Sequence, residues 1–144
     1  MNSKYFNFEP QTKLIFGTNS LNSLKTELKP FGNTLLIVAQ KKIEEMGYLK
    51  RVTDQLTDGH FKLYFWSSIH DNPVVSDVDD AVESLKSIKF DAIIALGGGS
   101  TIDVAKALSV TACTGGLAWD YVYSSAKRTV SQTIPVIAIP TTSG

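Results

Sequence analysis

The chain has little that would support a disulfide framework, a zinc site or binding through bulk charge. It contains one cysteine, Cys113, in 144 residues, which excludes an intramolecular disulfide and leaves no Cys/His cluster for zinc. We expect this thiol to be buried and inert, as suits a reducing compartment. The 14 basic and 14 acidic residues cancel, so electrostatics give no reason to expect nucleic acid or an anionic membrane as a partner.

Long hydrophobic stretches are also missing. The first residues, MNSKYFNFEPQTK, contain no apolar core of secretory length, and no later run approaches the ~20 apolar residues that span a bilayer. We therefore expect a cytoplasmic protein. Its composition, with 43% hydrophobic and 19% charged residues, is that of a globular chain, and the length suits one compact domain over residues 1–144.

Five apolar runs have the character of buried β-strands. Most of them are continuous rather than alternating in polarity, which is typical of parallel strands covered on both faces by helices. The runs are residues 13–17, 34–39, 62–66, 91–97 and 134–140.

Segments with helical spacing of apolar residues lie between these runs. The three apolar stripes are Leu21, Leu24 and Leu28; Ile43, Met46, Leu49, Val52 and Leu56; and Val78, Val82, Leu85 and Ile88. Ser76 is expected to cap the third helix, with Asp77 near the positive end of its dipole. The alternation of strand and helix predicts a three-layer, Rossmann-like α/β fold, with a parallel sheet flanked by helices.

The stretch IIALGGGSTIDVAKAL joins a predicted buried strand to a predicted helix through three glycines. Gly97, Gly98 and Gly99 let the backbone approach a ligand where any Cβ would intrude. Ser100 then begins a helix whose first amides lack partners and whose dipole favours an anion. The pattern predicts a pyrophosphate site that needs no net basic charge. An ordinary glycine-rich turn is the structural alternative.

This turn differs from the common nucleotide-binding motifs. Ile102 stands where the usual dinucleotide fingerprint has a third glycine, and the turn follows a late strand rather than the first. No Gly-Lys-Ser/Thr follows the glycines, which disfavours an ATP-type phosphate loop. Asp103 and Lys106 are spaced i, i+3 and are expected to pair on the helix surface.

The segment GGGSTIDVAKAL closely resembles the signature of the iron-containing (group III) alcohol dehydrogenase family, Gly-Gly-Gly-Ser-x-x-Asp-x-Ala-Lys. KLIFGTNSLNSL resembles the family's opening strand and helix, DNP its Asn-Pro element, and IPVIAIPTTSG the start of its Pro-Thr-Thr-x-Gly-Thr segment. The resemblance covers nearly the whole chain.

The resemblance implies that residues 1–144 are the N-terminal NAD(P)-binding domain of a longer protein. A helical domain beyond residue 144 would hold a divalent metal, iron or possibly zinc, between an aspartate and three histidines. No metal ligand or catalytic residue is then expected in this chain, and the piece alone is expected to be inactive. His60 and His70 lack ligand spacing and are expected to be structural or solvent-facing.

The resemblance also implies roles for particular residues. The glycine-rich turn with Ser100 would hold the pyrophosphate, and Asn72 would line the same cleft. Thr141 and Thr142 would contact the nicotinamide side of the cofactor, and Asp103 would approach the carboxamide. The implied reaction is hydride transfer between the nicotinamide and an alcohol, aldehyde or ketone, with the metal as Lewis acid. Because family members are commonly dimers or larger, a homo-oligomer is expected.

Gln40 bears on the choice between NAD and NADP. Many NAD-using members of the family carry an aspartate after the second strand, where its carboxylate accepts hydrogen bonds from the adenosine ribose. Here the sequence LLIVAQKK has Gln40 at that position. A neutral amide does not repel a 2′-phosphate, and Lys41 or Lys42 would attract one, so both cofactors are admissible. The alternative is that the lysines begin a solvated helix.

Two other functions remain open from the sequence. One is a relative such as glycerol dehydrogenase or dehydroquinate synthase, which has a related glycine-rich turn. Ser100, Ala105 and the Pro-Thr-Thr ending favour the alcohol dehydrogenases over these relatives. The other is a nucleotide-binding module without catalytic function.

Overall fold

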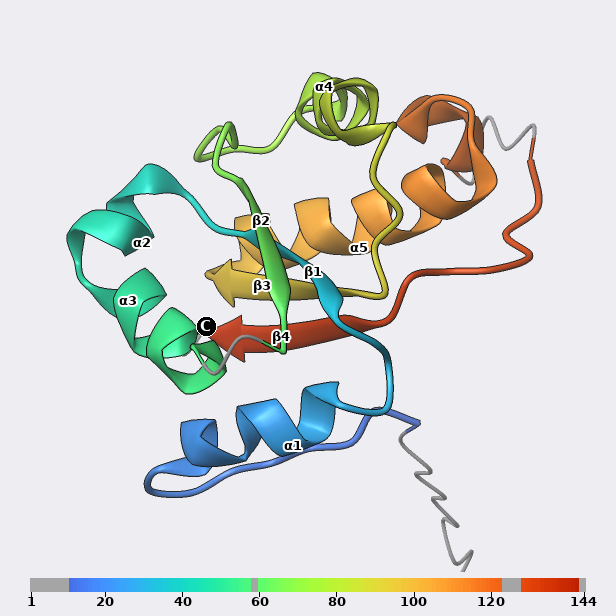
Figure 1. Ribbon diagram of the computed structural model, residues 1–144. Coiled ribbons are helices and arrows are strands. Elements are labelled where there is room, and N and C mark those ends of the chain that lie inside the picture. Colours follow the sequence, from blue (N-terminus) through green and yellow to red (C-terminus); the bar gives the residue numbers. More distant parts are fainter. Residues whose placement is uncertain (1–10, 58–59, 123–127, 143–144) are drawn as a thin grey trace, which may run out of the picture.

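The chain builds a parallel sheet with helices on both faces (Figure 1). The computed structural model describes residues 11–57, 60–122 and 128–142. Within these residues the sheet has four strands in the order β2-β1-β3-β4. The strands are β1 (Thr34–Val38), β2 (Lys62–Trp66), β3 (Ala92–Gly97) and β4 (Val136–Pro140). The α/β fold predicted from the sequence is confirmed.

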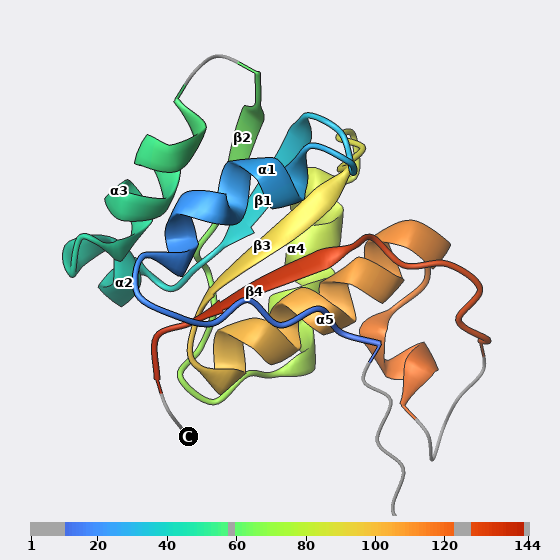
Figure 2. The same cartoon turned by 90° about the horizontal axis from the view of Figure 1, so that it is seen from below.

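The helices lie in two layers. On one face are η1 (Ser20–Ser23), α1 (Leu24–Leu28), α2 (Lys41–Glu45), α3 (Tyr48–Thr53) and η2 (Asp54–Leu56). On the other are α4 (Val75–Leu85), α5 (Gly99–Thr114) and η3 (Ala118–Tyr121). Figure 2 shows α1 in front of the strands and α4 and α5 behind them.

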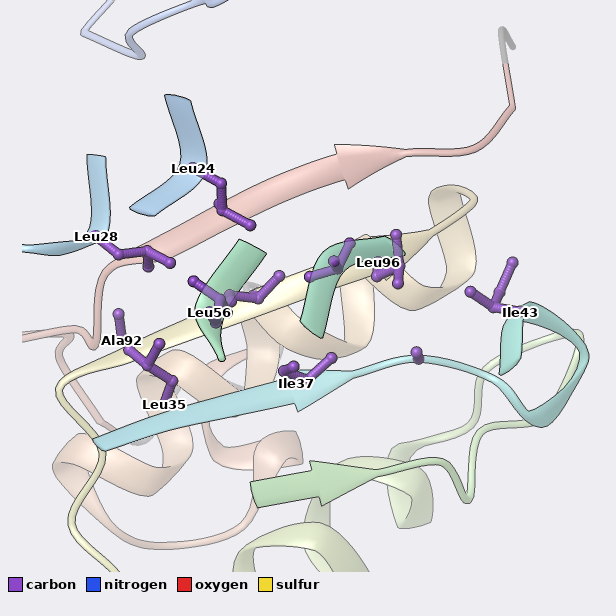
Figure 3. Packing of buried hydrophobic residues seen from close by; sticks show 11 residues of the cluster. Leu24, Leu28, Leu35, Ile37, Ile43, Leu56, Ala92 and Leu96 are labelled. Atoms are coloured by element: carbon purple, nitrogen blue, oxygen red, sulfur yellow. The ribbon is translucent and has the colours of Figure 1, made fainter. Parts of the chain in front are cut away.

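Apolar side chains fill both spaces between sheet and helices. Figure 3 shows the cluster on the α1–α3 side, where Leu35, Ile37 and Leu96 of the sheet meet Leu28 and Leu56 of the helices. On the α4–α5 side the buried cluster is Leu36, Val38, Val78, Ala81, Phe90, Ile93, Ala95, Val104, Ala105 and Leu108. Full burial of one such leucine or isoleucine contributes about 1.5–3 kcal/mol. These clusters hold the strands in place, and therefore also the loops at the ends of the strands.

The predicted strand over residues 13–17 is not formed. This segment has no regular structure, and the side chains of Leu14 and Phe16 are 84% and 94% exposed. Its continuous apolar pattern is that of a buried strand, but no neighbouring strand pairs with it among the described residues. The hydrophobic pattern of a segment shows only that it could form a strand. Whether the strand forms depends on a neighbouring strand that pairs with it.

Three smaller predictions were also wrong. The second apolar stripe forms two short helices, because Gly47 takes a left-handed φ of 77° between α2 and α3 and leaves Met46 exposed. Ser76 is not the N-cap of α4, because the helix begins at Val75 and its N-cap is Val74. Cys113, expected to be buried, lies on an exposed part of α5.

Candidate functional site

The carboxyl ends of β1 and β3 lie side by side at the point where the chain connections diverge. From β1 the chain crosses to β2 on one side, whereas from β3 it crosses to β4 on the other. Open parallel sheets bind ligands in the crevice at such a point. Gln40 follows β1 and the glycine-rich turn follows β3, so the fold brings these two sequence-predicted features to the same edge (Figure 1).

The first glycine of the turn is required by the packing of the turn itself. The carbonyl of Gly97 accepts a hydrogen bond of 3.0 Å from the Thr141 amide, and Gly97 lies opposite Pro140 in the sheet. A Cβ on Gly97 would lie 2.5 Å from Oγ1 and 2.8 Å from Cβ of Thr101. The Thr101 side chain is fully buried. A larger residue at position 97 would therefore displace the start of α5.

The next two glycines are not explained by packing. A Cβ on Gly98 would reach ordinary distances from the Thr142 side chain, 3.4 Å to Oγ1 and 3.6 Å to Cγ2. A Cβ on Gly99 would meet nothing within 4 Å. Side chains are thus missing where the protein itself leaves room for them. Glycine at such positions leaves the backbone open to close approach from outside the chain.

The backbone of this turn enters the first turn of α5 at the exposed Gly99. Gly98 is extended, and the first α-helical hydrogen bond of α5 runs from the Ile102 amide to the Gly98 carbonyl, at 3.1 Å. The amides of the first turn of a helix have no partner within that helix. Together with the dipole of a 16-residue helix, they favour an anion at this position.

Ser100 and Gln40 both reach the loop that follows β2. The Ser100 hydroxyl donates a hydrogen bond of 2.8 Å to the Asp71 carbonyl. The Gln40 amide nitrogen donates to Oδ1 of Asp71 at 3.2 Å, and lies 3.5 and 3.4 Å from the carbonyls of Ile69 and His70. This loop is thereby tied to the end of β1 and to the start of α5.

The other predicted site residues are placed differently. Asn72 is exposed and directly follows the tied residue Asp71, so its loop belongs to the same edge. Thr142 is the neighbour of Gly98 described above. Asp103 is 73% exposed and pairs with Lys106 at 3.6 Å, as the i, i+3 spacing predicts. Its carboxylate thus has a surface partner one turn into α5.

A buried carboxylate accepts hydrogen bonds from the same loop. Asp77 is 3% exposed, and its oxygens accept hydrogen bonds from the amides of Val74 at 3.0 Å and His70 at 3.3 Å. Nδ1 of His70 lies 2.6 Å from its other oxygen. Burial alone would raise the pKa of Asp77, but these hydrogen bonds and the nearby imidazole together lower it below the ordinary value. The group is ionised at neutral pH.

Sequence reasoning missed the role of Asp77 and the burial of Thr101. A carboxylate three residues after the N-cap that accepts the N-cap amide is half of a capping box, which is the signal that identifies Asp77. Thr101 is a polar residue on the buried side of an otherwise apolar helix, and its hydroxyl has no hydrogen-bond partner in the described part of the chain. The helical spacing of Thr101, Ala105 and Leu108 is the sequence signal that identifies its position on the buried side.

The described residues do not fit a metal ion. Across residues 11–57, 60–122 and 128–142, no three His, Cys, Asp or Glu side chains gather into a possible ligand set. His60 is exposed, and His70 is engaged with Asp77. Within the same residues no helix combines the length and the hydrophobicity that crossing a bilayer requires.

An open parallel sheet with an anion-favouring glycine turn at its switch point defines a Rossmann-like α/β protein. The chain belongs to the iron-containing alcohol dehydrogenase family, whose model matches residues 10–144. The resemblance found in the sequence is confirmed.

Relatives of known name agree with this membership. The chain is 37% identical over 118 residues to probable NADH-dependent butanol dehydrogenase 1 of Bacillus subtilis, covering 81% of this chain and 30% of that protein. It is 29% identical to NADH-dependent butanol dehydrogenase A of Clostridium acetobutylicum, covering 96% and 35%. A crystal structure of NADH-dependent butanol dehydrogenase A from Thermotoga maritima superposes with a TM-score of 0.84 at 29% identity, covering 95% and 34%. The chain thus spans about a third of the length of these relatives.

Proposed function

We propose that this chain is the cofactor-binding part of an NAD(P)-linked alcohol dehydrogenase, and that the glycine-rich turn with the start of α5 binds the cofactor's pyrophosphate. The observation that carries the proposal is the open space at Gly99, next to helix amides without partners inside the helix. A turn that served only to connect strand and helix would have no need of glycine at that position.

The neighbouring residues would complete the site in stated roles. Ser100 and Gln40 hold the loop that carries Asn72, and Asn72 would line the cofactor cleft. Thr141 and Thr142 follow β4 beside the turn and would contact the nicotinamide half of the cofactor. Asp103 would approach the carboxamide only after leaving Lys106.

The choice between NAD and NADP depends on the end of β1. The relatives named above are NADH-dependent. In this chain the Gln40 amide is turned toward the loop after β2, and exposed Lys41 and Lys42 begin α2 beside it. No carboxylate stands at Gln40 to repel a 2′-phosphate, so we propose that both cofactors bind.

The reaction proposed for the whole protein interconverts an alcohol and an aldehyde or ketone. When bound, the nicotinamide supplies the hydride acceptor or donor. The described residues would bind and orient this cofactor, and among them no three His, Cys, Asp or Glu side chains gather into a set that would hold a metal.

Titration calorimetry with NADH tests the proposal. The Gly99→Val variant places a branched side chain in space that the fold leaves open, so we expect a folded protein with affinity lowered at least about tenfold. Ala112→Val is the control, because it places the same branched side chain at an exposed position more than three turns further along α5. NADPH titrated in parallel measures the cofactor preference.

Three results would contradict the proposal or part of it. Unchanged NADH affinity in folded Gly99→Val would make the turn purely structural. An equal loss in Ala112→Val would show that bulk anywhere on α5 is harmful. Binding of NADH alone, with none of NADPH, would refute the proposed dual cofactor use.

A further inference from the structure

Asp77 is the one charged side chain that the described part of the chain buries. Burying a carboxylate costs several kcal/mol unless hydrogen bonds satisfy it. Here the donors come from the loop before α4: the Val74 amide, the His70 amide and the ring of His70. The buried charge therefore fixes the backbone of residues 70–74.

The same loop, residues 69–74, is held from two other elements. Gln40 binds it from the end of β1 through Oδ1 of Asp71, and Ser100 binds it from the start of α5 through the Asp71 carbonyl. Asp71 adjoins His70, whose amide and ring both contact Asp77. A continuous path thus joins the Asp77 carboxylate to Ser100: the hydrogen bond to His70, the peptide unit between His70 and Asp71, and the hydrogen bond from Ser100.

We propose that Asp77 is a positioning residue: by fixing the 69–74 loop, it holds Asn72 and the glycine-rich turn in the geometry that binds the cofactor. The role of Asp77 in cofactor binding rests on the proposed function, whereas the hydrogen-bonded link from Asp77 to the turn does not. The lowered pKa of Asp77 keeps its carboxylate ionised, and so able to accept all of these hydrogen bonds, at neutral pH.

Amide hydrogen exchange followed by NMR tests the link without any cofactor. In Asp77→Asn, the charged acceptor of the His70 and Val74 amides becomes a neutral and weaker amide oxygen, and we expect exchange of these two amides to accelerate several-fold. If the loop positions the turn, exchange at Gly99 and Ser100 rises as well, while exchange in β1 and β3 stays at the wild-type rate. The control is Asp80→Asn, which makes the same charge change at an exposed position of α4.

A second pair of variants keeps the test informative if Asp77→Asn does not fold. His70→Ala removes only the ring contact, and Ser100→Ala cuts the path from the other end. We expect the two effects on exchange at Gly99 to be non-additive, because both act through one loop. Additive effects, or faster exchange confined to residues 69–74, would overturn the proposal.

NADH titration of the same variants separates this proposal from the proposed function. We expect Asp77→Asn to weaken NADH binding several-fold and Asp80→Asn to leave it unchanged. If wild type shows no affinity for NADH while the exchange results hold, the proposed function fails and the positioning link stands. If Asp77→Asn changes exchange at the turn but not NADH affinity, the positioning role in binding is refuted.

Discussion

The ends of β1 and β3 lie at the same edge of the sheet but carry different kinds of polar group. After β3, three glycines lead directly into a 16-residue helix, and the groups at the edge are main-chain amides. After β1, Gln40 leads into a 5-residue helix, and the group at the edge is a side-chain amide. Both strands are almost fully buried, so the difference lies in the turns alone.

This difference separates contacts that the fold itself makes from the contacts proposed for a ligand. Main-chain amides at the end of β3 are present whatever residues stand there, but a side chain at position 98 or 99 would fill the space beside them. At the end of β1 the side chain itself makes the contact, so exchanging it changes the chemistry. Substitutions at β3 should therefore act through steric exclusion, and substitutions at β1 through lost or repulsive polar contacts.

The largest effect on stability is expected at Gly97. In Gly97→Ala the added Cβ overlaps Oγ1 and Cβ of Thr101, and we expect the free energy of unfolding to fall by about 2–3 kcal/mol. Urea unfolding measures this change. A loss below about 0.5 kcal/mol would mean that the turn relaxes freely and that the first glycine is not structural.

Gln40→Glu should have the next largest effect. A carboxylate cannot donate to Asp71 and faces the carbonyls of Ile69 and His70, so we expect about 1 kcal/mol of lost stability. Gln40→Met, which removes the donor without adding charge, is expected to lose less in the same urea unfolding. Equal stability of wild type and Gln40→Glu would show that these contacts contribute nothing.

Gly98→Ala makes the same chemical change as Gly97→Ala one residue later and sharpens the comparison. Its Cβ reaches only ordinary distances, but alanine is a poorer N-cap than glycine, so we expect a stability loss of no more than about 1 kcal/mol. NADH affinity is nevertheless expected to fall, as measured by calorimetry. A large stability loss with intact affinity would reverse the roles assigned to the two glycines.

The smallest effect is expected in the dependence of stability on acid pH. This dependence arises from Asp77, which binds the loop between the two strand ends. The folded-state pKa of Asp77 lies below its ordinary value of 3.8, so its contribution is complete above that value and is lost as the pH falls through it toward the folded-state pKa. The difference in unfolding free energy between wild type and Asp77→Asn should therefore be larger at pH 6 than at pH 3. A pH-independent difference would contradict this, and Asp80→Asn provides the baseline.

Most of the sheet could be predicted from the sequence because its strands are continuous apolar runs. The predicted runs 34–39, 62–66, 91–97 and 134–140 each contain a strand of the structure. The run 13–17 has the same local pattern but finds no partner strand among the described residues. Local hydrophobicity cannot distinguish the two cases, because pairing depends on residues far away along the chain.

The site was predictable only as far as it is local. The glycine-rich turn and the start of α5 form one continuous segment, and the sequence pattern identifies both. The contact from Gln40 to Asp71 spans 31 positions, and that from Ser100 to Asp71 spans 29. Such contacts depend on the path of the loop after β2, and this path in turn depends on Asp77, which the sequence pattern places only near a helix dipole.

The central claim is that main-chain amides around Gly98 to Thr101 bind the diphosphate of a dinucleotide. An NMR titration of the labelled chain with NADH tests it most directly. The account predicts the largest amide shifts at Gly98, Gly99 and Ser100, with little change at Gly32, which precedes β1 at the opposite edge of the sheet. Large shifts elsewhere, with the amides of this turn unmoved at saturation, would contradict it.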